Sequence, residues 1–351
     1  MHEGVGKEMA SIGIGIIGLG LALKPHMLAL RDLSDRATIV GGFSPTPQRR
    51  VQFQSAWNAP TFDSLEALLA DARVDAVLIP TPPRTHAELA LAAARAGKHV
   101  LLEKPLDVDH ASARALVDEV EKLDRTFGIV FQHRFRPGSI ALREALRSDR
   151  LGDLVSVSAS IRWWRSFEYF AEPGRGTMAR DAGGVLLTQA IHTLDLLLDL
   201  AGPVRRAFAL ARTSPLRDID TEDIACATLE YASGAIGVVD ATTTAYPGYP
   251  ERIELAGTKG SALLEGERLV LQRPDEPPVA VEGSTSGGGG ADPMAFSHEA
   301  HRRLIADFLD AVEQGRQPLA SARSALRVHA LIDTMLASSR AQRMVDAPAT
   351  T

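Results

Sequence analysis

A lysine stands directly before a proline in the segment Glu103-Lys104-Pro105, after a short apolar run at residues 99–102. The run predicts a buried strand, so Lys104 should lie at the carboxyl end of that strand. Ligands of open α/β sheets bind at such ends. A lysine that is shielded from water there can lose its proton near neutral pH, as proton transfer with an alcohol or ketone requires. Taken alone, the tripeptide is more typical of a surface turn.

A second polar group lies in the segment from Gly183 to Asp195. Thr188, His192 and Asp195 are spaced i, i+4 and i+7, which places them on one face of a predicted helix together with an apolar stripe. A lone helical histidine is more often a core residue, but a lysine elsewhere that needs a partner favours substrate contact for His192. Only His192 and Asp195 offer metal ligands in this segment, so we predict no metal site.

A glycine turn, Gly18-Leu19-Gly20, follows the apolar run at residues 12–17 and precedes a predicted helix. In this setting glycines let the backbone approach a pyrophosphate at the helix N-terminus. The usual third small residue is replaced by Leu23, and a tight packing turn remains the alternative. Because the turn comes first in an α/β series, we favour nucleotide binding.

The end of the second predicted strand, at residues 37–43, bears on the choice of cofactor. Domains that prefer NAD usually carry a carboxylate at this place, where this chain has Ser44. Arg49 and Arg50 follow and could accept a 2′-phosphate, which favours NADP over NAD; the alternative is a pair of surface arginines. After the third predicted strand, Thr81-Pro82-Pro83 with His86 suits a wall of the cofactor crevice, although alone it is only a turn signal.

The order of predicted elements divides the chain into two domains. Strands and helices alternate over the first 130 residues, which predicts a parallel, doubly wound sheet. Later strands follow each other through short turns, which predicts a large, mainly antiparallel open sheet in an α+β domain. We therefore predict a Rossmann domain over residues 10–133 and an α+β domain over residues 134–345. The later strands are expected at residues 154–161, 204–212, 224–231, 235–242, 252–256 and 261–264.

Composition excludes several partners for this chain of 351 residues. Its net charge of −6 argues against nucleic acid or an anionic membrane as the main partner. No stretch approaches the roughly 18 continuous apolar residues of a membrane span, and the first residues lack a secretory signal. The single cysteine, Cys226, is interpreted as a small core residue and fits a reducing compartment, so we expect a cytoplasmic protein. Residues 282–293 predict a low-complexity surface loop.

Together these segments resemble the Gfo/Idh/MocA family of NAD(P)-dependent oxidoreductases, named after glucose–fructose oxidoreductase and inositol dehydrogenase. The resemblance extends over most of the chain. The matching segments are Gly18-Leu19-Gly20 with His26, Thr81-Pro82-Pro83 with His86, Glu103-Lys104-Pro105, Arg134-Phe135 with Pro137, Gly183-Gly184 through His192-Thr193-Leu194-Asp195, and Gly257-Thr258-Lys259-Gly260.

The resemblance implies a role for several residues. Lys104 would be the acid–base group, His192 would contact the reacting oxygen, and Glu103 would order the nicotinamide end of the cofactor. The family often has an aspartate four residues before the histidine, where this chain has Thr188. Thr188-Gln189 looks like the corresponding pair in some sugar-acid dehydrogenases of the family, so Lys104 and His192 remain but the carboxylate is missing. The residues expected at the substrate are Gln132, Thr188 and Tyr246, and those expected at the cofactor are Gly18, Leu19, Gly20, Leu21, Ala22, Ser44, Arg49, Thr81, Pro82, His86, Glu103 and Lys104.

The expected function is hydride transfer to or from a secondary alcohol carbon of a sugar, sugar acid or cyclic polyol. The run Arg162-Trp163-Trp164-Arg165, with Tyr169 and Arg175 beyond it, could reach an acidic or aromatic ligand. A dihydrodiol dehydrogenase, or a net non-redox enzyme with retained cofactor, is possible on the same scaffold, and a dinucleotide-binding regulatory protein is the alternative outside enzymes. By resemblance, a homodimer or homotetramer would form through the C-terminal sheet.

Overall fold

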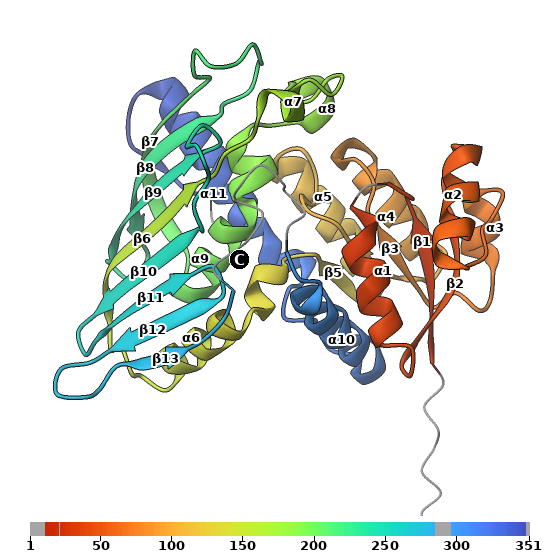
Figure 1. Cartoon of the computed structure of the whole chain (residues 1–351), viewed down its shortest axis with the longest axis horizontal. Coiled ribbons are helices and arrows are strands. Elements are labelled where there is room, and N and C mark those ends of the chain that lie inside the picture. The colour runs from red at the N-terminus through yellow and green to blue at the C-terminus, as the bar shows by residue number, and fades with distance from the viewer. Residues whose placement is uncertain (1–10, 21, 285–295, 349–351) are drawn as a thin grey trace, which may run out of the picture.

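The computed structural model describes residues 11–20, 22–284 and 296–348. Leu21, which we expected at the cofactor, and most of the predicted loop at residues 282–293 lie outside the described residues. Two sheets dominate the molecule, one in each half of the chain (Figure 1). Figure 1 shows the smaller sheet among the N-terminal elements and the larger sheet at the opposite side of the molecule.

The first sheet has five parallel strands in the order β2-β1-β3-β4-β5. Its strands are β1 (Ile12–Ile17), β2 (Ala37–Phe43), β3 (Ala76–Ile79), β4 (His99–Leu102) and β5 (Phe127–Ile129). Every residue of β1, β3 and β5 is buried, as expected for strands that are covered on both faces by helices. Those helices are α1 (Leu23–Asp32), α2 (Pro47–Trp57), α3 (Leu65–Ala70), α4 (His86–Arg95) and α5 (His110–Glu121). The predicted doubly wound parallel sheet is therefore confirmed.

The second sheet has nine strands in the order β13-β12-β11-β10-β6-β9-β8-β7-β14. Neighbouring strands are antiparallel except for β6 and β9, which are parallel, so the predicted mainly antiparallel open sheet is confirmed. The strands are β6 (Leu154–Arg162), β7 (Val204–Arg212), β8 (Ile224–Tyr231), β9 (Ile236–Thr242), β10 (Arg252–Gly257), β11 (Ser261–Glu265), β12 (Arg268–Gln272), β13 (Val279–Val281) and β14 (Val345–Asp346).

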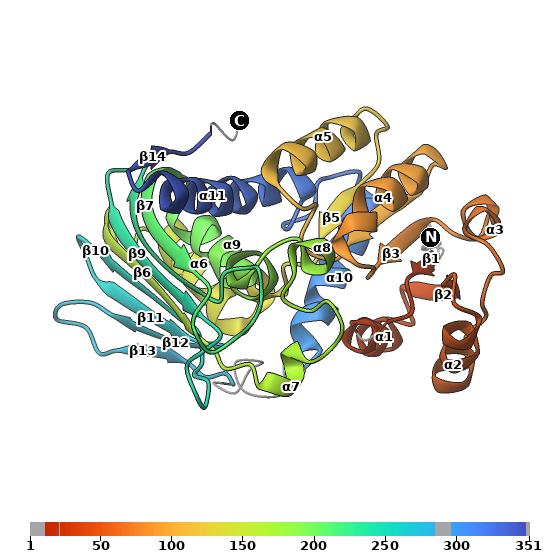
Figure 2. The same ribbon diagram turned by 90° about the horizontal axis from the view of Figure 1, so that it is seen from above.

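One face of the larger sheet is covered by helices and the other is bare of described elements (Figure 2). The remaining elements are η2 (Gln132–Phe135), α6 (Pro137–Arg147), α7 (Phe167–Phe170), α8 (Met178–Asp181), the π-helical turn η3 (Leu186–Ala190), α9 (Ile191–Ala201), α10 (Glu299–Gln314) and α11 (Ala322–Ala341), with a short turn η1 (Pro83–Thr85) before α4. Helices α6, α9 and α11 pack on the inner face, between the two sheets.

The last two long helices connect the two halves of the molecule. Helix α10 packs against α1, and the His298 Nε2 before it lies 2.7 Å from the Asp32 carboxylate. At the start of α11, Arg323 donates to Asp118 of α5 at 2.8 Å, and near its end Ser338 accepts from Ala209 N of β7 at 2.9 Å. The two halves therefore share an interface built by C-terminal helices, and the boundary at residues 133 and 134 stays a prediction.

Cys226 is exposed on the bare face of β8, so its predicted core position was wrong. Successive side chains of a strand point to opposite faces. Ala225 and Ala227 are buried on the inner face, and Cys226 between them faces outward. An apolar run of small residues hid this alternation in the sequence.

Among the described residues, one stretch, Met178–Ala201, is long and apolar enough to cross a membrane by length and composition. However, 83% of its most apolar 18 residues are buried inside the protein. The stretch contains η3 and α9, and α9 packs against β6 of the larger sheet. Its apolar character is that of a core helix.

Candidate active site

Five loops at the carboxyl edge of the parallel sheet bring the predicted residues together. In sheet order, the strands β2, β1, β3, β4 and β5 end just before Ser44, Gly18, Thr81, Glu103-Lys104 and Gln132. Parallel strands end at the same edge of a sheet, so residues separated by up to 114 positions, as Gly18 and Gln132 are, lie at one edge there. The strand order reverses between β1 and β3, which is where doubly wound sheets open a crevice for a ligand.

Lys104 is held between the two halves of the molecule. Its Nζ donates a 2.9 Å hydrogen bond to the main-chain oxygen of Thr188, 84 residues further along the chain. Burial lowers the pKa of Lys104, and the charge of Arg165 acts in the same direction, whereas the carboxylate of Glu103 opposes them. A lysine with a lowered pKa gives up its proton more readily than a lysine in water, as acid–base work requires.

His192 lies on α9 with only 9% of its surface exposed. Its Nδ1 has no hydrogen-bond partner, and its ring centroid lies 5.1 Å from that of His133. Burial, followed by the charge of Lys104, holds the pKa of His192 well below its ordinary value of 6.5. The imidazole is therefore neutral at physiological pH and can offer one N–H to a substrate oxygen.

A cavity of about 380 Å³ joins these groups. Six of the residues predicted for catalysis, substrate or cofactor line it, namely Ala22, Glu103, Lys104, Gln132, Thr188 and His192. Gln132 has a buried side-chain oxygen without a partner, as expected for a group that meets a ligand. The volume lies in the range of pockets for small molecules.

Linked polar side chains form part of the wall of this cavity. Arg165 is 2% exposed and donates to Gln189 Oε1 at 3.0 Å. Gln189 Nε2 in turn donates to Tyr169 Oη at 2.9 Å, and Arg175 donates to the same hydroxyl at 2.9 Å. All four side chains line the cavity, whereas Arg162 pairs with Asp240 outside it.

Tyr246 does not line the cavity. Its side chain is 75% exposed and packs edge-on against Trp164, with 5.6 Å between the ring centroids.

Asp195, which helical spacing placed on one face with Thr188 and His192, does not share their surroundings. Its carboxylate accepts two hydrogen bonds from Arg134 at 2.5 and 2.6 Å, so it forms a buried ion pair away from the substrate cavity.

The glycine turn has the local geometry of a close backbone approach. Gly18 has a φ of 108°, and a Cβ there would lie 2.6 Å from the Thr81 side chain, so only glycine fits without strain. A Cβ on Gly20 would meet no atom within 4 Å. Leu19 is buried beneath the turn and Ala22 lines the cavity. The turn thus leaves open space at the start of α1, the place where dinucleotide-binding domains hold a pyrophosphate.

The remaining predicted cofactor residues have differing surroundings. Ser44 is buried, and its main-chain oxygen accepts from Arg50 at 2.7 Å, while Arg49 is exposed. His86 is also buried, with its two ring nitrogens 2.7 and 2.8 Å from the carbonyl oxygens of Pro105 and Thr81. His86 therefore fixes the two loops that follow β3 and β4, and Pro82 lies in the first of these.

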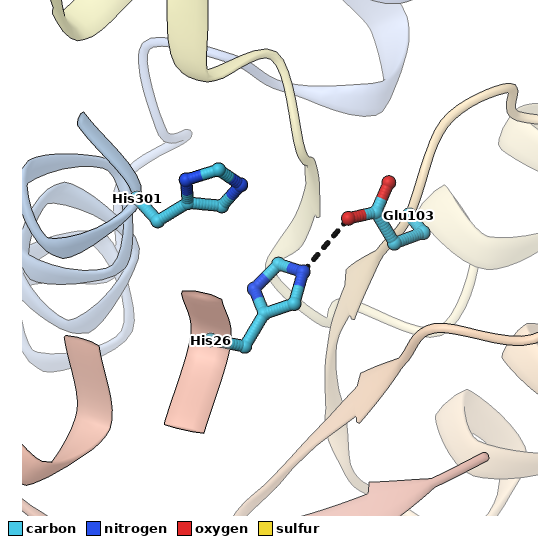
Figure 3. A group of neighbouring side chains, drawn as sticks. All are labelled: His26, Glu103 and His301. Carbon is cyan, nitrogen blue, oxygen red and sulfur yellow. Dashed lines mark hydrogen bonds and ion pairs between the residues drawn. The ribbon is translucent and has the colours of Figure 1, made fainter. Parts of the chain in front are cut away.

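Glu103 and His301 line the cavity, and His26 lies between them (Figure 3). His26 Nε2 lies 2.7 Å from the Glu103 carboxylate. Burial raises the pKa of Glu103, but the hydrogen bond with His26 and the charge of Lys104 outweigh it and lower the value to about 2. Burial also lowers the pKa of His301 to about 3. Within the described ranges, this set alone brings three possible metal ligands together, within 4.8 Å of one another, and the absence of a metal site stays a prediction.

Comparisons with known proteins agree with this architecture. Residues 12–131 match the oxidoreductase family with an NAD-binding Rossmann fold, and residues 140–263 match the GFO/IDH/MocA C-terminal domain. The chain belongs to the Gfo/Idh/MocA family. It is therefore a dehydrogenase or reductase that acts on CH–OH groups with a nicotinamide dinucleotide.

Individual relatives extend over nearly the whole chain. The inositol 2-dehydrogenase of Rhizobium meliloti is 28% identical over 95% of this chain and 99% of its own length. An NADP-dependent D-xylose 1-dehydrogenase of Haloferax volcanii is 27% identical over 95% and 98%. The structure of the WlbA dehydrogenase from Bordetella pertussis, in complex with NADH and UDP-GlcNAcA, has a TM-score of 0.83, 27% identity, and coverage of 97% of this chain and 99% of that chain.

For this member of the Gfo/Idh/MocA family, sequence reasoning missed several residues that line the cavity, among them His133 and Gln189. His133 is buried, its Nδ1 has no hydrogen-bond partner, and it follows Gln132 directly. The signal in the sequence that could have identified His133 is its position after the last strand of the parallel sheet, where side chains reach the ligand crevice. Gln189 was named only as a neighbour of Thr188, and its link to Arg165 and Tyr169 depends on folding that brings three segments together.

Proposed function

We propose that this enzyme transfers a hydride between NAD(P) and a secondary alcohol carbon of a sugar, sugar acid or cyclic polyol. The observation that carries the proposal is the convergence of Lys104 and His192 on one cavity. The dinucleotide, when bound, accepts or supplies the hydride. The open space at Gly20 suits its pyrophosphate, and Glu103, which pairs with His26, suits its nicotinamide end.

The enzyme's own residues would handle the proton and the geometry. In oxidation, Lys104 Nζ removes the hydroxyl proton while the C–H hydrogen leaves with its two electrons and the C=O bond forms. In reduction, the same Nζ returns the proton to the oxygen. Neutral His192 donates a hydrogen bond to that oxygen and keeps the reacting carbon in position. Gln132 and Thr188 lie around the same space and would contact the other hydroxyl groups.

Among these substrate classes, the polar wall favours a sugar acid. Arg165 and Arg175 line the cavity together with Tyr169, and arginine binds carboxylates through paired, charge-assisted hydrogen bonds. The relative from Bordetella pertussis was crystallised with UDP-GlcNAcA, which supports including nucleotide-linked sugar acids among the candidates. A regulatory dinucleotide sensor would have no use for a buried lysine and a neutral histidine at one cavity.

A substrate screen tests the proposal directly. The purified enzyme is incubated with sugars, inositols, sugar acids and nucleotide-linked sugar acids, each with NAD and with NADP, while nicotinamide absorbance is followed. We expect turnover with at least one polyhydroxy substrate and a preference for acids over the matching neutral sugars. Cofactor binding without turnover across the whole panel would instead favour a regulatory protein.

We also propose that copies of the chain associate through the bare face of the larger sheet as a homodimer or homotetramer. Four large apolar side chains are exposed there, Phe208 and Leu210 on β7 and Ile236 and Val238 on β9. An apolar face of this kind is typical of a protein interface. Light scattering should give a mass of two or four chains, and Val238→Glu should lower it; a monomeric wild type would contradict the proposal.

A further inference from the structure

The helix that carries His192 begins with an irregular turn. The π-helical turn η3 (Leu186–Ala190) runs directly into α9. Such turns are rare, contain one extra residue, and occur frequently at functional sites. The wider turn lets a main-chain carbonyl bond to a group outside the helix. Thr188 lies at the centre of η3, and its main-chain oxygen accepts the 2.9 Å hydrogen bond from Lys104 Nζ.

The Thr188 side chain makes a different contact. Its Oγ1 donates to the main-chain oxygen of Gly184 at 2.7 Å, and the Thr188 main-chain N–H donates to the same oxygen at 2.9 Å. The hydroxyl is therefore engaged within the helix. What Thr188 offers to Lys104 is a neutral carbonyl, at a position from which an aspartate side chain would offer a negative charge.

We propose that the π-helical turn makes Thr188 a positioning residue, whose main-chain carbonyl holds Lys104 Nζ in place of a carboxylate partner. This inference rests on the proposed acid–base role of Lys104. A carbonyl accepts a hydrogen bond from an amine as well as from an ammonium group, so it can hold Nζ in both protonation states. A carboxylate at the same place would favour the charged form.

Other charged groups around Lys104 also affect its pKa. Carboxylates of Glu103 and Asp181 stabilise the ammonium form, whereas burial and Arg165 oppose it. Burial is the largest of these effects, so the pKa of Lys104 lies below its ordinary value of 10.5. The groups that face Lys104 are Glu103 after β4, Arg165 after β6, Asp181 of α8, His133 of η2 and His192 of α9.

The two histidines do not obscure the ionisation of Lys104. Burial holds the pKa of both His133 and His192 well below 6.5, so both are neutral over the pH range in which the lysine titrates. The fall of the oxidation rate on the acid side of its pH profile, the acid-side limb, should therefore follow the protonation of the Lys104 amine. An added negative charge next to Nζ would move that limb to higher pH.

The test compares Thr188→Asp with the uncharged, matched variant Thr188→Asn. In the pH profile of kcat/KM for oxidation, we expect Thr188→Asp to raise the acid-side pKa by about one unit or more. Below that pKa, the rate should fall roughly tenfold relative to Thr188→Asn. Thr188→Asn should keep the acid-side pKa of the wild type even if its turnover is lower, because the main-chain carbonyl is retained. The same acid-side pKa in both variants would overturn the inference.

A second measurement is independent of activity. The chain has six lysines, so the ε-carbon signals of ¹³C-labelled lysine can be resolved by NMR, and Lys104→Ala identifies the signal of Lys104. We expect its titration midpoint to lie below that of the other lysines in the wild type and in Thr188→Asn, and to rise in Thr188→Asp. A wild-type midpoint at the ordinary lysine value would contradict the inference, even if Thr188→Asp failed to fold.

The two measurements separate this inference from the proposed function. If the NMR midpoints move as expected while Lys104→Ala keeps its turnover, the result supports the carbonyl contact and rejects the catalytic role of Lys104. If Lys104→Ala loses turnover while the titration midpoint of Lys104 is the same in Thr188→Asp and Thr188→Asn, the result supports the catalytic role of Lys104 and rejects the positioning role of Thr188.

Discussion

His192 and Asp195 are buried polar side chains in neighbouring turns of α9, and their surroundings differ. Both carboxylate oxygens of Asp195 accept hydrogen bonds from Arg134. His192 instead faces a cavity, and its Nδ1 has no partner. Buried polar groups that are fully paired hold a fold together, whereas those left without a partner at a cavity are available to a ligand. The spacing of residues alone did not separate these two roles.

The ion pair gives the largest expected effect and tests the structural half of this comparison. Arg134→Ala should lower the free energy of unfolding by about 3–5 kcal/mol, because it leaves the buried Asp195 charge without compensation. Chemical denaturation measures this loss. The double variant Arg134→Met/Asp195→Leu is the control and should regain much of the stability. Equal stability of Arg134→Ala and wild type would show that the pair does not hold the fold.

His192 tests the other half of the comparison. His192→Ala should lower kcat/KM by roughly ten- to a hundredfold, the scale of one hydrogen bond to a developing charge, with the loss shared between kcat and KM. The free energy of unfolding should change much less than in Arg134→Ala. Steady-state kinetics and denaturation of the same samples check both statements. A stability loss as large as that of Arg134→Ala, without a kinetic effect, would assign His192 to the core.

A similar contrast divides the two glycines of the first turn. Gly20→Val should weaken cofactor binding about tenfold, or about 1.4 kcal/mol, in a folded protein, because its side chain would occupy space that is open beside α1. Gly18→Ala should instead lower stability, since its φ of 108° and the nearby Thr81 disfavour any side chain. Fluorescence titration of NADH and NADPH measures the first effect. Unchanged affinity in Gly20→Val would reject the pyrophosphate assignment.

The smallest expected effect concerns the choice between the two dinucleotides. NADP should bind a few-fold more tightly than NAD, because Arg50, which donates to the main-chain oxygen of Ser44, offers a cation to the 2′-phosphate. Ser44→Asp should reverse the order through repulsion of the 2′-phosphate. Ser44→Asn is the uncharged control and should keep the wild-type order. Tighter binding of NAD by the wild type would mean that the arginines only face solvent, as exposed Arg49 does.

The parts of this enzyme that sequence reasoning predicted are those that depend on local patterns. Continuous apolar runs such as residues 12–17 and 99–102 indicated buried parallel strands, and Lys104 followed from its place after one of them. Where the pattern was weak, the sequence led to a wrong prediction or to none. The two-residue strand β14 has no periodicity to detect, and the small residues around Cys226 concealed which face they occupy.

The candidate site was predicted as a set of residues but not as a geometry. Helical spacing placed His192 and Asp195 on one face, yet it could not show that Arg134, 61 residues away, would neutralise Asp195. The π-helical turn at Thr188 has no local sequence signal, and it changes which atom meets Lys104. These features arise from contacts between distant segments, which a single sequence does not encode in a readable pattern.

The most direct test of the account is the turnover of Lys104→Ala with a substrate found in the screen. Its cofactor affinity is measured alongside, and Lys122→Ala on the exposed surface of the same half serves as control. We expect Lys104→Ala to lose roughly two or more orders of magnitude in kcat, the usual scale of general acid–base catalysis, with little change in cofactor affinity, while Lys122→Ala matches the wild type. Near-normal turnover in folded Lys104→Ala would contradict the account.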